Sequence, residues 1–96
     1  IDLEPDNSAF QDSLGWVMYR FGKLEEALHH LQLAKQLMEE KKEEDPVIYD
    51  HLGDVYLKLN DPFSARENWV RAESIYTEPA EKNKIQNKIK NLDLNK

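Results

Sequence analysis

The sequence predicts an all-α chain of helical hairpins, and three observations support this fold class. The 96 residues include only 3 Gly and 4 Pro, and no long stretch alternates apolar and polar residues as a half-buried strand does. Apolar residues instead recur three or four positions apart, which is the spacing of one face of a helix. The chain also resembles itself when it is shifted by 38 residues. These features indicate helices joined by short connections.

The first hairpin is predicted from two apolar stripes that Gly22 separates. The first stripe contains Phe10, Leu14, Val17, Met18 and Phe21. The second stripe contains Leu24, Ala27, Leu28, Leu31, Ala34, Leu37 and Met38. We expect residues 39–45, which are all charged, to extend the second helix by about one turn. Pro46 would then end that helix.

A second hairpin and a fifth helix follow. The third stripe contains Ile48, Leu52, Val55, Tyr56 and Leu59, and the fourth contains Ala65, Trp69, Ala72 and Ile75. Between them, Asp61 is suited to cap a new helix and Pro62 to its first turn. Ile85, Ile89 and Leu92 form the stripe of the fifth helix, and Thr77 and Pro79 mark its start.

The internal repeat places many residues in register. The shift of 38 residues pairs Asp12 with Asp50, Leu14 with Leu52, Gly15 with Gly53, Val17 with Val55, Ala27 with Ala65 and Ala34 with Ala72. Gly15 and Gly53 lie within predicted helices, where Gly costs about 1 kcal/mol relative to Ala. We therefore expect close helix packing at both glycines. The aromatic side chains expected in the core are Trp69, Tyr49, Tyr56, Phe10 and Phe21.

The repeat carries a resemblance to a known family. Tyr49-x2-Leu52-Gly53-x2-Tyr56, followed by Ala65-x3-Trp69, resembles the tetratricopeptide repeat (TPR) family. The first hairpin keeps Leu14-Gly15 and Ala27 but has Gln11, Met18 and Leu31 at the aromatic positions. The resemblance covers residues 1–76, and the segment 12–20 is also similar to the C-terminal repeats of bacterial TPR proteins.

The resemblance implies an α-solenoid of two TPR hairpins plus a C-terminal capping helix. We expect residues 1–7 to end a preceding repeat, and residues 8–45 to form repeat 1 with an extended second helix. Residues 46–76 would form repeat 2, and residues 77–96 the capping helix and tail. Since the chain begins with Ile, we expect it to be a piece of a longer protein. The bacterial cytoplasm and the envelope-associated periplasm both stay open as compartments.

The expected binding surface lies on the first helix of each hairpin. At about 100° per residue, one arc outside the core stripe holds Ala9, Asp12, Trp16, Tyr19 and Arg20. The same arc one repeat later holds Val47, Asp50, Asp54, Leu57 and Lys58. In TPR proteins this surface lines a concave groove that holds an extended peptide or a partner helix. The resemblance therefore assigns partner binding to Asp12, Trp16, Tyr19, Arg20, Asp50, Asp54, Leu57 and Lys58.

The residues of this surface indicate the chemistry of the partner. Three aspartates make it acidic, Trp16 and Tyr19 supply rigid aromatic anchors, and two basic residues form an edge. We expect a protein or peptide partner with basic and apolar side chains. Some TPR domains grip a chaperone's terminal carboxylate with Lys, Asn and Arg, and Asp and Trp do not suit that task. Alternatively, Trp16 and Tyr19 pack against a neighbouring repeat or against helices upstream of this sequence.

Composition argues against several other functions. The net charge is −6, which does not favour a nucleic-acid partner. The chain has no Cys and no apolar run of about 20 residues, so we expect neither thiol chemistry nor membrane insertion. Glu25 and Glu26 with His29 and His30, and His51 with Asp54, offer too few ligands for a metal site. We expect no cofactor and no enzyme activity, with a small zinc hydrolase as the rival to test.

Two further alternatives concern the ends of the chain. Residues 81–96 hold five Lys and two acidic residues, a net charge of +3. We interpret this end as the polar cap of a solenoid, and binding of an anionic surface is the alternative. At the other end, Phe10 and Leu14 with Ile1 and Leu3 could pair with a second copy of the chain. Self-assembly through this open repeat end is the alternative to partner binding.

Overall fold

The computed structural model describes residues 7–94, and every regular element in that range is an α-helix. The helices are α1 (Ser8–Arg20), α2 (Leu24–Glu40), α3 (Pro46–Lys58), α4 (Pro62–Ile75) and α5 (Pro79–Leu94). This confirms the all-α prediction. The helices belong to two compact units that divide between Glu44 and Asp45.

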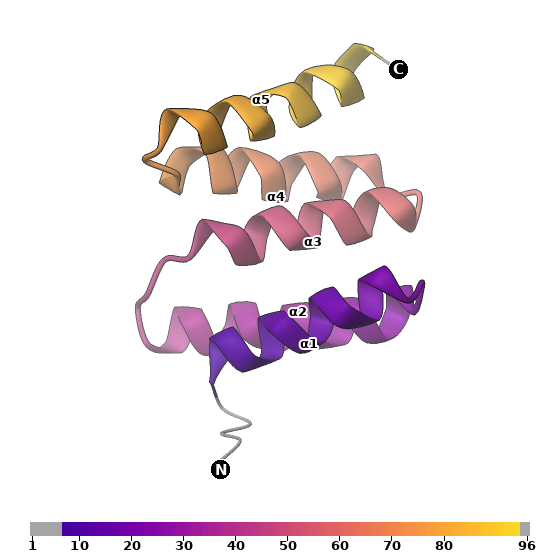
Figure 1. Ribbon diagram of the computed structural model, residues 1–96, viewed down its shortest axis with the longest axis vertical. Helices are drawn as coiled ribbons and strands as arrows, with labels where there is room; N and C mark the ends of the chain where they lie inside the picture. Colours follow the sequence, from indigo (N-terminus) through magenta and orange to yellow (C-terminus); the bar gives the residue numbers. More distant parts are fainter. Residues whose placement is uncertain (1–6, 95–96) are drawn as a thin grey trace. The chain divides into compact units, whose positions relative to one another are not determined.

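The first unit is the hairpin of α1 and α2, which run antiparallel (Figure 1). The Asn7 side chain caps the N-terminus of α1 by accepting a hydrogen bond from the backbone N–H of Phe10 at 3.1 Å. Gly22 makes the turn with φ +78°, a left-handed conformation that Gly adopts without steric cost. Glu25 and Glu26 lie in the first turn of α2, where negative charge interacts favourably with the helix dipole and stabilises the helix.

The second unit contains α3, α4 and α5, and α5 lies along α4 (Figure 1). Asp45 caps α3, because its side chain accepts from the N–H of Val47 at 3.0 Å. Asp61 caps α4 by accepting from the N–H of Ser64 at 3.1 Å, which confirms its predicted role. The turn between α3 and α4 places Asn60 at φ 63°, and Asn tolerates this region better than most residues.

Both mid-helix glycines lie under a large side chain of the second helix of their hairpin. A Cβ added at Gly15 would lie 2.6 Å from Cγ of Leu31, and one at Gly53 would collide with the Trp69 ring. Trp69 is only 2% exposed, and its indole N–H donates to the backbone oxygen of Asp50 at 3.2 Å. The predicted close packing at the two glycines is confirmed.

The aromatic core prediction is right in part. Trp69 and Tyr49 are buried, and Phe10 and Tyr56 are half-buried. Phe21 contradicts the prediction, because its side chain is 78% exposed. It is the capping residue that follows the last residue of α1. The apolar pattern of the sequence therefore extends one residue beyond the end of the helix, where there is no longer a packed face.

The expected extra turn at residues 39–45 is also wrong. Helix α2 ends at Glu40, and Lys42 adopts a left-handed φ of 56°, which an α-helix cannot accommodate. The carboxylate of Asp45 is used to begin the next helix. These charged residues thus form the connection between the two units, with only the first two of them in α2. The division into repeats at 8–45, 46–76 and 77–96 stays a prediction, and residues 1–6 lie outside the described part of the chain.

Candidate functional site

The predicted surface on α1 contains a stacked aromatic pair. Trp16 and Tyr19 are three positions apart, so they project from the same side of the helix. Their ring centroids are 4.8 Å apart with an angle of 18° between the planes. Both side chains are half-buried, as is Asp12 one turn earlier, and Arg20 is exposed. The pair is a flat apolar surface with an acidic residue on one side and a basic residue on the other.

The predicted surface on α3 has a different chemistry. Asp50 and Asp54 are one turn apart, and both are half-buried. Val47, Leu57 and Lys58 are exposed on the same helix. At the positions of Trp16 and Tyr19, this helix carries Asp54 and Leu57, so no aromatic pair is formed. The α3 surface is an anionic site with apolar residues beside it.

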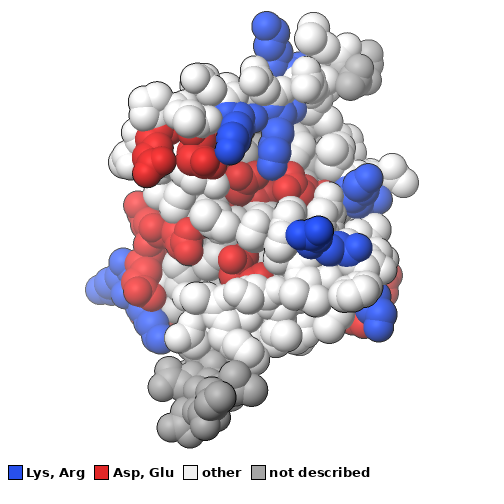
Figure 2. Space-filling model, viewed as in Figure 1, with Lys and Arg blue, Asp and Glu red and all other residues white. Residues whose placement is uncertain are grey.

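The two α3 carboxylates already hold a cation from the same chain. The ammonium of Lys88, on α5, lies 2.8 Å from Oδ1 of Asp50 and 3.0 and 3.2 Å from Oδ1 and Oδ2 of Asp54. The hydroxyl of Tyr76 donates to Oδ2 of Asp50 at 2.9 Å. Figure 2 shows basic side chains directly beside acidic ones on the part of this face that α3 and α5 form. We call these four residues, Asp50, Asp54, Tyr76 and Lys88, the α3–α5 cluster.

Burial and pairing act in opposite directions on the titration of this cluster. Burial raises the pKa of Asp54, and the attraction of Lys88 offsets this only in part. Burial lowers the pKa of Lys88, but hydrogen bonding to Asp50 and the attraction of Asp54 outweigh it, so this pKa is raised overall. Burial and the bond to Asp50 raise the pKa of Tyr76. Since one ammonium serves two carboxylates, the site stays anionic with Lys88 in place.

Sequence reasoning did not identify Lys88 or Tyr76 as part of this surface. Both are remote from Asp50 in sequence, and periodicity does not pair a helix with a distant one. One sequence feature does distinguish Lys88 from Lys84 and Lys90 on the same helix. At about 100° per residue it lies roughly 60° from Ile85, at the border of the apolar stripe, as does Lys82 on the other side. Lys82 contacts the neighbouring helix as well, through the backbone oxygen of Glu73 at 3.1 Å.

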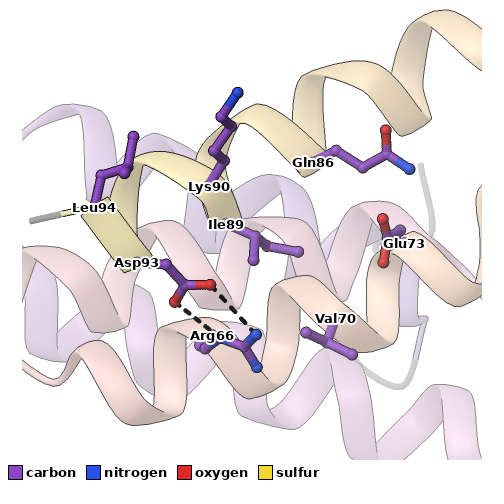
Figure 3. Close-up of a pocket in the computed structure, with 8 residues that line it drawn as sticks. All are labelled: Arg66, Val70, Glu73, Gln86, Ile89, Lys90, Asp93 and Leu94. Atoms are coloured by element: carbon purple, nitrogen blue, oxygen red, sulfur yellow. Dashed lines mark hydrogen bonds and ion pairs between the residues drawn. The ribbon is translucent and has the colours of Figure 1, made fainter. Parts of the chain in front are cut away.

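A separate groove of about 540 Å³ lies between α4 and α5. Figure 3 shows Ile89 and Asp93 pointing from α5 toward α4, whereas Lys90 points away. Arg66 of α4 and Asp93 of α5, which both line the groove, form an ion pair of 3.1 Å. The groove is lined by Arg66, Val70, Glu73, Gln86, Ile89, Lys90, Asp93 and Leu94.

The described residues offer little support for a metal centre. Across residues 7–94, no group of three or more His, Asp or Glu side chains is placed to hold a metal ion. His30 instead contacts the buried Gln11, with 2.8 Å between Nδ1 and Oε1.

No helix in the described part of the chain has the length and apolar character needed to cross a membrane.

One solved structure resembles this chain closely in fold. The N-terminal domain of stress-induced protein-1 (STI-1) from C. elegans superposes with a TM-score of 0.77 at 22% sequence identity. The match covers 95% of this chain and 71% of that one. No protein-family model and no curated protein matches the sequence. The bacterial origin expected from the sequence stays a prediction, whereas the structural match establishes that the chain has an all-α, TPR-like helical repeat fold.

Proposed function

We propose that this chain is a non-catalytic protein-interaction module for a peptide or partner helix that carries basic and apolar side chains. The stacked pair of Trp16 and Tyr19 is the observation that carries the proposal. Two rings held together on one helix lose little side-chain entropy on binding, and aromatic residues dominate the energetics of many interfaces. The TPR-like fold supports the proposal, since helical repeats commonly use such surfaces to bind proteins.

The charges on the two helices favour a basic partner. Asp12 lies beside the aromatic pair on α1, and Asp50 and Asp54 retain a net negative charge beside Leu57 on α3. Complementary charge increases the association rate more than it increases the affinity. Each helix ends in a basic residue, Arg20 on α1 and Lys58 on α3, which would repel a basic side chain placed next to it.

The test uses the two tryptophans of the chain as a paired reporter. Basic-apolar and acidic peptide pools are added to the 15N-labelled chain at low and physiological salt, and the two indole N–H signals are followed. We expect the basic pool to shift the Trp16 signal and the acidic pool to leave both signals in place. If neither pool shifts Trp16, the aromatic pair has a structural role and the proposal fails.

Charge reversal tests the electrostatic part of the proposal. We expect Asp12→Lys to lower the association rate of a basic peptide at low salt, with a smaller effect at high salt. Glu26→Lys is the matched control, because Glu26 is exposed on the other helix of the same hairpin and the charge change is identical. Equal association rates for the two variants would contradict the role of Asp12.

Self-assembly is the second candidate, and exposed apolar residues of the first hairpin favour it. Val17 and Phe21 are 47% and 78% exposed near the end of α1. Phe10 and Leu14, the residues first expected at this contact, are half-buried, and Ile1 and Leu3 lie outside the described residues. A mass that rises with concentration in light scattering would support self-assembly. A constant monomer mass at high concentration would exclude it.

A further inference from the structure

We propose that Lys88 is a built-in competitor of the partner, because its ammonium occupies the place on α3 that a basic side chain of the partner takes in the complex. The inference rests on the proposed function and names the chemistry of one contact within it. The expected ligand group is the ammonium of a lysine or the guanidinium of an arginine.

In the α3–α5 cluster, Lys88 and Tyr76 together engage all four carboxylate oxygens of Asp50 and Asp54. An ammonium has three N–H donors, and Lys88 lies within hydrogen-bond distance of one oxygen of Asp50 and both oxygens of Asp54. The remaining oxygen of Asp50 accepts from Tyr76. Each carboxylate oxygen can still accept a second hydrogen bond, but the Asp50 and Asp54 side chains are only 17% and 15% exposed. A second cation at these oxygens would lie beside the Lys88 ammonium and be repelled by it. A basic side chain of a partner therefore binds these carboxylates most favourably by replacing Lys88.

Lys88 can leave without unfolding its helix. Its side chain is 36% exposed and sits on a flexible four-carbon stem, so rotation about the stem carries the ammonium into water. Helix α5 remains attached through the fully buried Ile85 and through the ion pair between Asp93 and Arg66. The exchange replaces one cation with another, so the half-buried carboxylates are never left without a partner, which would be costly.

Competition of this kind lowers the affinity by a calculable factor. The apparent dissociation constant equals the intrinsic one divided by the fraction of chains in which Lys88 has left the site. An ion pair at the upper end of the usual surface strength gives about a fivefold effect. Lys88 would thus select for ligands whose basic side chain binds both carboxylates at least as well as it does.

The test compares Lys88→Met with Lys84→Met. Methionine keeps the unbranched stem and removes the charge at either position. Lys84 lies on the same helix, and its recorded ion pair is with Glu81 of α5 at 3.4 Å, so this control makes the same change in net charge. We expect Lys88→Met to bind a lysine-containing basic-apolar peptide about fivefold more tightly than the wild type does. We expect Lys84→Met to bind it no more tightly than the wild type.

A second measurement follows the ammonium itself. Side-chain 15N spectra of the wild-type chain report whether the Lys88 NH3+ group is held in an ion pair or free in water. We expect the bound peptide to convert the Lys88 signal from that of an ion-paired ammonium into that of an ammonium free in water. Tighter binding by Lys88→Met together with this conversion supports the inference.

The outcomes separate this inference from the proposed function. If the peptide shifts the Trp16 signal but binds wild type and Lys88→Met equally, Lys88 is no competitor and the proposed function stands. The inference is equally overturned if the peptide binds while the Lys88 signal stays unchanged. If no peptide binds either chain, the proposed function fails and the inference fails with it.

Discussion

The substitution Gly53→Ala tests the packing argument most directly, because two effects of known sign oppose each other. In the interior of a helix, Ala is favoured over Gly by about 1 kcal/mol. The added Cβ, however, would collide with the Trp69 indole. Overpacking of this kind costs typically about 1–3 kcal/mol, and more where the neighbour cannot move.

The surroundings of Trp69 decide between these effects. The ring is 2% exposed, and its N–H is bonded to the backbone of Asp50 at 3.2 Å. Moving the ring would break this bond and disturb α3, so the steric cost falls at the upper end of its range. Loss of all Trp69 packing, about 3–5 kcal/mol, sets the limit. We expect Gly53→Ala to lower the free energy of unfolding by about 2 kcal/mol net.

Thermal and urea denaturation followed by circular dichroism would measure this change. About 2 kcal/mol corresponds to a fall in Tm of roughly 10 °C in a domain of this size. Gly15→Ala is the matched comparison, since its Cβ would meet the flexible Leu31 side chain at 2.6 Å. We expect a smaller loss there. Equal or greater stability of Gly53→Ala would show that helix propensity dominates and would refute the packing argument.

Three further predictions concern exposure and titration. Phe21→Ser should leave Tm almost unchanged, because the ring is 78% exposed, and a large loss would place Phe21 in the core after all. The pKa values of Tyr76 and Lys88 are raised in the folded chain, so they contribute stability that is present below about pH 10 and lost as pH rises further. In alkaline denaturation curves, Tyr76→Phe should therefore lose less stability above about pH 10 than the wild type does. Hydrogen bonding to Ser64 lowers the pKa of Asp61, so the free energy of unfolding should fall as pH drops below about 4. If Asp61→Asn loses stability with acid in the same way as the wild type, this role of Asp61 is refuted.

The parts of the fold that were predictable depend on contacts between near neighbours in sequence. Asp61 caps a helix that begins at the next residue, and the spacing of apolar residues reflects a helical period that is fixed by backbone geometry. Close packing at Gly53 was predictable because a glycine recurs at the same position of both hairpins, whereas its contact with Trp69 became known only from the structure. Helix ends were harder to predict, since the apolar pattern includes Phe21, which lies after the last residue of α1.

The α3–α5 cluster was not predictable from the same patterns. Its contacts join Asp50 to Tyr76 and Lys88, which belong to later segments, and a polar side chain has several solvated alternatives of similar free energy. The spacing of aspartates correctly located Asp50 and Asp54 together on α3. It could not show that their charge is already used within the chain, and this changes what a partner would meet there.

The composition of α5 explains why this helix depends on such polar contacts. Ile85 is its one fully buried residue in the described range, which is little apolar surface to hold a helix of 16 residues. Its attachment is completed by Lys82, Lys88 and Asp93, each bonded to α3 or α4. Ionic contacts near the surface weaken with salt, whereas the packing of Trp69 does not. Helix α5 should therefore be the element of this unit whose stability depends most on ionic strength, and Lys88 should move most easily when a competing cation arrives.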